Sequence, residues 1–129
     1  RIIMANPNIV NVTTINGSTV ANTPSTATAT TLLSNPASSS QVIKVNTLIA
    51  TNLSGVANTT IGCTVSYNNG ANNTGTSYPV ANNIPVPQAA SLIVLDKSSS
   101  IYLTENTSIV VTSSSASGLS FVCSYEVIS

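Results

Sequence analysis

Charged side chains are nearly absent from this chain of 129 residues, which has three Lys or Arg, three Asp or Glu and no His. General acid–base catalysis most often uses His, and a Ser-His-Asp arrangement cannot be built without it. A carboxylate pair would require two of Asp96, Glu105 and Glu126 to converge, and nothing in their positions supports this. We therefore expect no enzymatic activity and no catalytic residue.

The same scarcity argues against several kinds of binding site. Three scattered cations cannot form the basic cluster that nucleic acid phosphates require, so we expect no nucleic acid partner. Two Cys without His cannot complete a tetrahedral metal site, so we expect neither a metal nor a cofactor. No run of 18 or more apolar residues occurs, so we expect no membrane span.

Cysteine occurs twice, as Cys63 and Cys123, each on the apolar face of a predicted strand. A disulfide between them would close a loop of about 60 residues and add roughly 4 kcal/mol of stability. The alternative is a pair of buried free thiols, which is favoured because no secretory signal peptide is visible. Met4-Ala-Asn-Pro is typical of a translation start, so we expect residues 1–3 to precede the natural start.

Small polar residues replace the missing charges, with 21 Ser, 18 Thr and 16 Asn, while the hydrophobic fraction is 42%. Helix formers such as Glu, Lys and Gln are rare and β-branched residues dominate, which predicts an all-β fold. A surface of hydroxyls and amides has little electrostatic repulsion to keep copies apart. Permanent packing in an assembly tolerates such a surface.

Strand-like segments of about ten residues separated by turns predict one antiparallel β-sandwich of seven to nine strands, jelly-roll or immunoglobulin-like, over residues 26–129. Residues 41–53 form the longest predicted strand, with Ile43, Val45, Thr47, Ile49 and Leu53 on one face and Lys44, Asn46 and Asn52 on the other. Residues 77–86 contain two prolines, which predicts an edge strand.

Residues 101–128 are expected to form the closing hairpin. Period-2 alternation in the last strand places five residues on one face, namely Leu119, Phe121, Cys123, Tyr125 and Val127. We expect this face to meet that of Ile61, Cys63 and Tyr67 across the core. Tyr102, which flanks a turn, is expected to be the most exposed aromatic side chain.

Residues 1–25 are interpreted as an extended N-terminal arm. Asn16-Gly17 predicts a hairpin turn within it. Apolar residues without a local partner could add a strand to the sheet of a neighbour, and they are Ile9, Val10, Val12 and Ile15. The alternative is that the arm forms the first strand of its own sandwich.

An Asn/Gly-rich segment, residues 68–75, is predicted to form a tip loop. Asn69, Asn72, Asn73 and Tyr78 are candidate exposed contacts for a glycan or a receptor, and the alternative is a flexible, solvated tip. Six glycosylation sequons begin at Asn11, Asn16, Asn52, Asn58, Asn72 and Asn106. This composition yields about five by chance, so we attach no function to them.

From Val42 onwards, the last two thirds of the chain resemble small virion structural proteins of tailed phages, especially cyanophages. The matching segments are Lys44-Val-Asn-Thr-Leu-Ile, Leu92-Ile-Val-Leu-Asp-Lys, Ile101-Tyr-Leu, Ser108-Ile-Val-Val-Thr and Ser124-Tyr-Glu. The turn at residues 104–107 departs from the relatives, because it has no Gly and only one acid. The resemblance implies a jelly-roll or immunoglobulin-like sandwich that decorates or cements a phage head.

That resemblance sets the functional expectations. We expect a non-enzymatic capsid decoration or cement protein on the capsid exterior, with the major capsid protein or other virion proteins as partners. A homo-oligomer, such as a trimer, is also expected. Two alternatives stay open: a tail, neck or fibre-associated virion protein that contacts the host surface, and a secreted adhesin-type sandwich with a Cys63–Cys123 disulfide.

Overall fold

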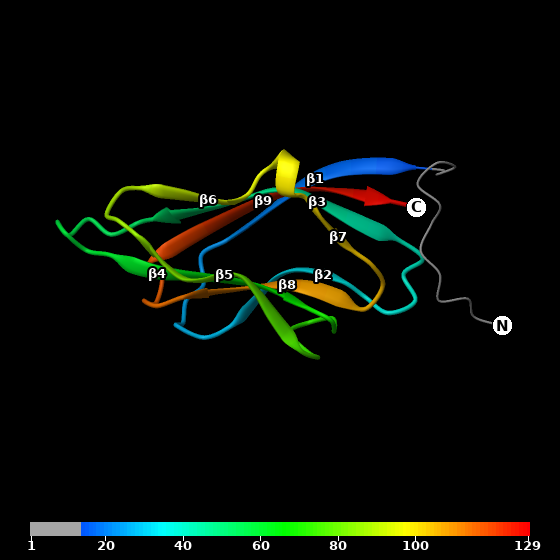
Figure 1. Ribbon diagram of the computed structural model, residues 1–129, viewed down its shortest axis with the longest axis horizontal. Helices are drawn as coiled ribbons and strands as arrows, with labels where there is room; N and C mark the ends of the chain where they lie inside the picture. The colour runs from blue at the N-terminus through cyan, green and yellow to red at the C-terminus, as the bar shows by residue number, and fades with distance from the viewer. Residues whose placement is uncertain (1–13) are drawn as a thin grey trace.

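A computed structural model describes residues 14–129, which form two antiparallel sheets packed face to face (Figure 1). One sheet, here called sheet A, contains β1 (Ile15–Asn22), β3 (Val42–Asn52), β6 (Ser91–Leu95), β7 (Ile101–Leu103) and β9 (Leu119–Ile128). The other, sheet B, contains β2 (Thr30–Asn35), β4 (Ile61–Asn68), β5 (Ser77–Val86) and β8 (Thr107–Ser113). The expected β-sandwich is thus confirmed, with nine strands in the described residues.

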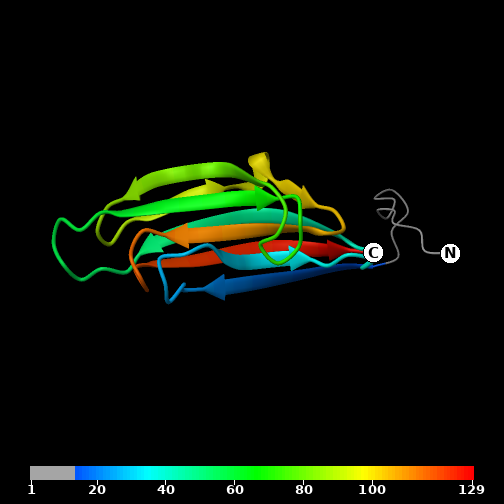
Figure 2. The ribbon, with the colours of Figure 1, turned by 90° about the horizontal axis from the view of Figure 1, so that it is seen from below.

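The strands pair as nested partners: β1 with β9, β2 with β8, β3 with β6 and β7, and β4 with β5. Pairing of β9 with β3 and of β8 with β4 then gives the sheet orders β1-β9-β3-β6 and β2-β8-β4-β5. This is the order of an eight-stranded jelly roll in which β6 and β7 together fill one strand position. Figure 2 shows the resulting two layers from below.

The predicted closing hairpin is wrong. β8 pairs with β2 and β4, whereas β9 pairs with β1 and β3, so these consecutive strands lie in different sheets. Each strand has a buried apolar face, with Ile109 and Val111 in β8 and Phe121 and Cys123 in β9. Alternation identifies a buried face, but it does not distinguish strands that pair side by side from strands that face each other across the core.

The predicted hairpin turn at Asn16-Gly17 is also wrong. Both residues lie inside β1, which pairs with β9 in unbroken register from Ile15 opposite Ile128 to Asn22 opposite Phe121. Eight consecutive pairs with β9 favour the extended conformation over the local turn. The residues that would have formed the other arm of this hairpin, up to residue 13, lie outside the described part.

A register shift between Val45 and Thr47 corrects the predicted face of β3. Ile43 and Val45 are buried as expected, but beyond the shift the buried residues are Leu48 and Ala50, because one extra residue moves the following side chains to the opposite face. The shift places Ile49 on the outer face. It also leaves Asn52 buried at 2% exposure, and the adjacent Leu53, expected inside, is 51% exposed.

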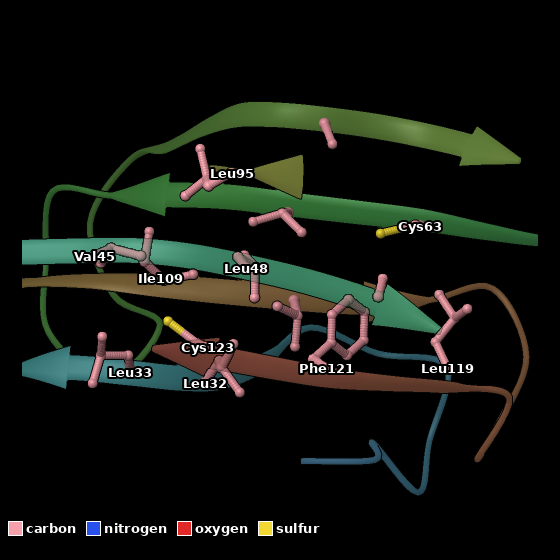
Figure 3. Packing of buried hydrophobic residues seen from close by; sticks show 14 of the residues in the cluster. Leu32, Leu33, Val45, Leu48, Cys63, Leu95, Ile109, Leu119, Phe121 and Cys123 are labelled. Carbon is pink, nitrogen blue, oxygen red and sulfur yellow. The ribbon is translucent and has the colours of Figure 1, made fainter. Parts of the chain in front are cut away.

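The core lies between the sheets, and Phe121 is its largest fully buried side chain (Figure 3). Ile61 and Cys63 of sheet B belong to the same apolar cluster as Phe121 and Cys123 of sheet A. The expected meeting of the two faces is therefore confirmed. Tyr67 and Tyr125 pack against this cluster as partly buried residues.

Buried asparagines end three successive strands, Asn35 of β2, Asn52 of β3 and Asn68 of β4. The amide of Asn35 donates to the carbonyls of Gln41 and Leu103, each at 2.9 Å. The amide of Asn52 donates to the carbonyls of Thr59 at 3.1 Å and Val86 at 2.8 Å. Asn35 and Asn52 thereby join the two sheets. Their amides also provide hydrogen-bond donors for main-chain carbonyls near the ends of strands.

Candidate functional site

The described residues contain no pocket, and no group of three or more His, Cys, Asp or Glu side chains among them could hold a metal ion. Within residues 14–129, no helix combines the length and the apolar character needed to cross a membrane. The surface of the sandwich and its loops therefore supply the candidate functional sites.

The three acidic side chains have separate hydrogen-bond partners. Asp96 caps the 3-10 helix η2 (Lys97–Ser99), and hydrogen bonds from Ser98 and then Ser99 lower the pKa of its carboxyl group. Glu105 Oε2 accepts the main-chain N–H of Ser40 at 2.8 Å, and Glu126 Oε1 accepts Asn46 Nδ2 at 2.9 Å. Each carboxylate thus has its own hydrogen-bond partners, and none of these bonds joins two carboxylates.

Both cysteines are free and fully buried in the apolar cluster. Figure 3 shows the two sulfurs at separate places in the core, Cys63 on β4 and Cys123 on β9. Burial raises the pKa of Cys63 to about 11 and that of Cys123 to about 12. Because the thiolate is the reactive form, these residues act as small core side chains and not as a redox or nucleophilic site.

The tip loop, residues 69–76, connects β4 to β5 and is tied to neighbouring elements. The N–H of Ala71 donates to Asn106 Oδ1 at 3.2 Å, and the N–H of Asn72 donates to Ser34 Oγ at 3.1 Å. The buried hydroxyl of Ser108 donates to the carbonyl of Gly70 at 2.7 Å. These bonds attach the loop to β2, to β8 and to the turn before β8.

Two of the predicted contact residues form side-chain hydrogen bonds within the tip loop and with the end of β4. Asn69 Oδ1 accepts the N–H of Thr76 at 2.6 Å, and Asn73 Oδ1 accepts Asn68 Nδ2 at 3.3 Å. Asn72 and Asn73 have positive φ, at 54° and 61°, which asparagine tolerates better than most residues. The asparagines therefore shape the loop as well as being exposed on it.

Tyr78, in β5 next to the tip loop, is the predicted contact residue that is best placed for an external contact. Its side chain is 53% exposed, and its ring lies 6.4 Å from that of Tyr67, tilted by 35°. Tyr67 packs against the core and so gives the exposed ring a fixed support. Tyr102 is 43% exposed, so the expectation that it would be the most exposed aromatic side chain is wrong.

A second surface, not anticipated from the sequence, crosses the outer face of sheet A. Phe121 and Cys123 point into the core, so Val122 between them points outward and is 41% exposed. Val122 lies opposite Ala21 of β1 and Ile49 of β3, and Ile49 lies opposite Ile93 of β6, which is 64% exposed. We call these four residues the outer apolar row.

Hydroxyl residues flank the outer apolar row on both sides. On one side, Ser124 lies opposite both Thr19 and Thr47. On the other, Thr51 lies opposite both Ser120 and Ser91, and its hydroxyl lies 2.9 Å from that of Ser91. An apolar centre with a polar, uncharged border is the composition expected of a protein-binding surface.

One sequence signal for this surface was the position of Val122, an apolar residue out of phase in the last strand. Ile49 gave no such signal, because the register shift that moves it to the outer face is not visible in the alternation. The alignment of the four residues also depends on strands that are distant in sequence. Only the pairing of β1, β9, β3 and β6 brings them into one row.

Of the four residues predicted for the assembly arm, Ile15 lies in the described part. It is the first residue of β1, is 52% exposed and lies opposite Ile128 of β9. Residues 15–22 are thus a strand of the chain's own sheet. Ile9, Val10 and Val12 lie outside the described residues.

Comparisons with known proteins gave no match to a family model, to a curated protein or to a solved structure. The surfaces described above are therefore the basis for a functional proposal.

Proposed function

We propose that this chain is a non-enzymatic structural protein of a tailed-phage virion, which binds the capsid exterior through the outer face of sheet A and decorates or cements the head. The outer apolar row carries the proposal, because Ile93 and Val122 are exposed at 64% and 41% on a regular sheet face. Apolar side chains aligned across four strands are typical of a surface that another protein covers. The partner we propose is the major capsid protein.

The polar surroundings of the row support a protein partner. Ser and Thr hydroxyls can donate and accept hydrogen bonds across an interface without the desolvation cost of charges. The chain has only six charged residues in all, so its surface has little to hold it apart from a neutral neighbour. Jelly rolls also occur among viral capsid domains, which supports the proposal by fold analogy.

The experiment measures co-sedimentation of the chain with purified capsids that lack it. We expect Ile93→Asp and Val122→Asp to abolish binding, because each places a charge in the apolar centre. The unfolding midpoint of each variant should stay near that of the wild type. Ala57→Asp, on an exposed loop residue, is the matched control and should bind normally. Wild-type binding by both row variants would refute this role of sheet A.

Quantitative mass spectrometry of purified particles tests the location. A copy number comparable with that of the major capsid protein supports the head, and absence from the particles rules out a virion role.

A tail or fibre role in host-surface contact is the second candidate. It is favoured by the exposed ring of Tyr78 in β5, which packs against Tyr67 next to the tip loop. A copy number far below that of the major capsid protein would favour it, as would loss of host-cell binding in Tyr78→Ala. The secreted adhesin alternative loses its expected disulfide, because Cys63 and Cys123 are free.

A further inference from the structure

Three of the four sheet edges carry features that hinder pairing with another strand. β5 contains Pro79 and Pro85 and has two register shifts against β4. β2 has only six residues and a register shift between Thr31 and Leu33. The edge formed by β6 and β7 is interrupted by η2, where Asp96 and Lys97 carry charges. Prolines, bulges, short strands and charges all protect an edge from edge-to-edge association.

Within residues 14–129, the fourth edge, β1, has none of these protections. Its eight residues contain no proline and no charge, and its register against β9 is unbroken. All of them are exposed except Val20 and Asn22, which are half-buried. A long, regular and uncharged edge is a template for an additional strand.

The hydrogen bonds at the start of β1 identify which main-chain groups face the open edge. Thr14 and Ser129 exchange two bonds, of 3.1 Å and 3.0 Å, so they form a hydrogen-bonded pair. Such pairs alternate along antiparallel strands. The even-numbered residues of β1 therefore bond to β9, and the N–H and C=O groups at the open edge belong to Ile15, Gly17, Thr19 and Ala21.

We propose that two copies of this chain associate through β1, antiparallel about a two-fold axis at Ser18. In this register, Ile15 of one copy pairs with Ala21 of the other, and Gly17 pairs with Thr19. All four residues of each copy then use both their open N–H and C=O groups. Because β1 is uncharged, its self-pairing brings no like charges together.

The outer face of sheet A supports this register independently of the hydrogen bonds. Ile15 is 52% exposed, and Ala21 is the β1 end of the outer apolar row. Pairing about Ser18 places Ile15 of each copy directly beside Ala21 of the other. The apolar row of each copy is thereby extended into its neighbour, which shields Ile15 from water.

We propose a second copy as the partner of β1 because β1 is complementary to itself in this register. Both its open hydrogen-bonding groups and its apolar side chains then find partners. This dimer goes beyond the proposed virion role and does not depend on it. It also implies two-fold rather than three-fold symmetry for the homo-oligomer.

Disulfide trapping in the full chain tests the register. Ser18 would face Ser18 of the second copy in a non-hydrogen-bonded pair, where Cα atoms lie about 4.5 Å apart, within disulfide range. We expect Ser18→Cys to form a covalent dimer under mild oxidation. Asn16→Cys, on the same strand and also exposed, would face Val20 and should stay monomeric on a non-reducing gel. The native cysteines are buried and should not interfere.

Analytical ultracentrifugation tests the association itself. We expect the wild type to sediment as a dimer and Thr19→Lys to halve that mass, since it brings two charges to the shared edge. Ala57→Lys adds the same charge on a loop and should remain dimeric, and unfolding midpoints confirm that both variants fold. A monomeric wild type at all accessible concentrations would overturn the proposal. So would equal cross-linking of the two cysteine variants, or a dimer that Thr19→Lys leaves intact.

Discussion

The side-chain amide of Asn52, at the end of β3, donates a hydrogen bond of 2.8 Å to the main-chain carbonyl of Val86, at the end of β5. These strands belong to different sheets, so the bond joins the two layers where both strands end. Asn52 also donates to the carbonyl of Thr59 and accepts the N–H of Ser54 at 2.8 Å. One buried side chain thus satisfies three main-chain groups.

Asn52→Ala should therefore lower the free energy of unfolding by about 2–4 kcal/mol, because it leaves buried main-chain groups without partners. Urea unfolding followed by circular dichroism measures the change. Asn82→Ala is the matched control, since Asn82 is exposed in β5, and it should shift the free energy by less than about 0.5 kcal/mol. Equal effects at the two positions would contradict the bridging role of Asn52.

Phe121 and Val122 are neighbours in β9 whose side chains lie on opposite faces. Phe121 is fully buried and Val122 is 41% exposed. Phe121→Ala should cost about 3–5 kcal/mol through loss of apolar contacts and formation of a cavity. Val122→Ala should cost less than about 1 kcal/mol, because much of this side chain is already in water. Thermal and urea unfolding of both variants check the difference.

The buried thiols predict a loss of stability at alkaline pH. Burial raises the pKa of Cys63 from 9.0 to about 11 and that of Cys123 from 9.0 to about 12, while the unfolded thiols ionise near 9. The stabilising contribution is fully present below pH 9. It is lost as the pH rises through the folded-state values, because the unfolded chain releases these protons first.

The measurement is the free energy of unfolding at several pH values between 8 and 11. This range includes the unfolded and the folded pKa of Cys63, 9.0 and about 11. Cys63→Ala and Cys123→Ala should each flatten the decline. Folded wild type should also resist a thiol reagent at pH 8 and react after unfolding in urea. Rapid labelling of the folded chain would contradict the burial of both sulfurs.

Two glycines should respond in opposite ways to substitution by alanine. A Cβ on Gly70 in the tip loop would lie 2.6 Å from the main chain of Thr74, whereas a Cβ on Gly17 in β1 would meet nothing within 4 Å. Gly70→Ala should therefore destabilise the chain by about 1–3 kcal/mol. Gly17→Ala should be neutral or stabilise it by up to about 1 kcal/mol, because it restricts the unfolded chain. Unfolding midpoints of both variants test this contrast.

Much of the strand content was readable from the sequence. Alternation in the last strand identified Leu119, Phe121 and Cys123 as core residues, and all three are fully buried. The prolines at positions 79 and 85 correctly placed β5 at a sheet edge. These predictions succeeded because they depend on side-chain direction and backbone donors, which are properties of each segment alone.

The candidate surfaces were less accessible from the sequence. Tyr78 and the asparagines of the tip loop could be identified as exposed residues, but the Tyr67–Tyr78 contact and the bonds to β2 and β8 could not. The outer apolar row was missed, because Ile49 is on the outer face only through the register shift in β3. Both features join residues from strands that are far apart in the chain.

By itself, then, the sequence determined an all-β chain with few charges, a set of apolar faces and an edge strand marked by proline. Only the tertiary structure decided that β8 and β9 face each other across the core, that Asn16-Gly17 is extended, and that β1 is an edge of its sheet within the described residues. The physical reason is that alternation specifies which side of a strand is buried. The partner and the register of that strand depend on long-range hydrogen bonds and packing.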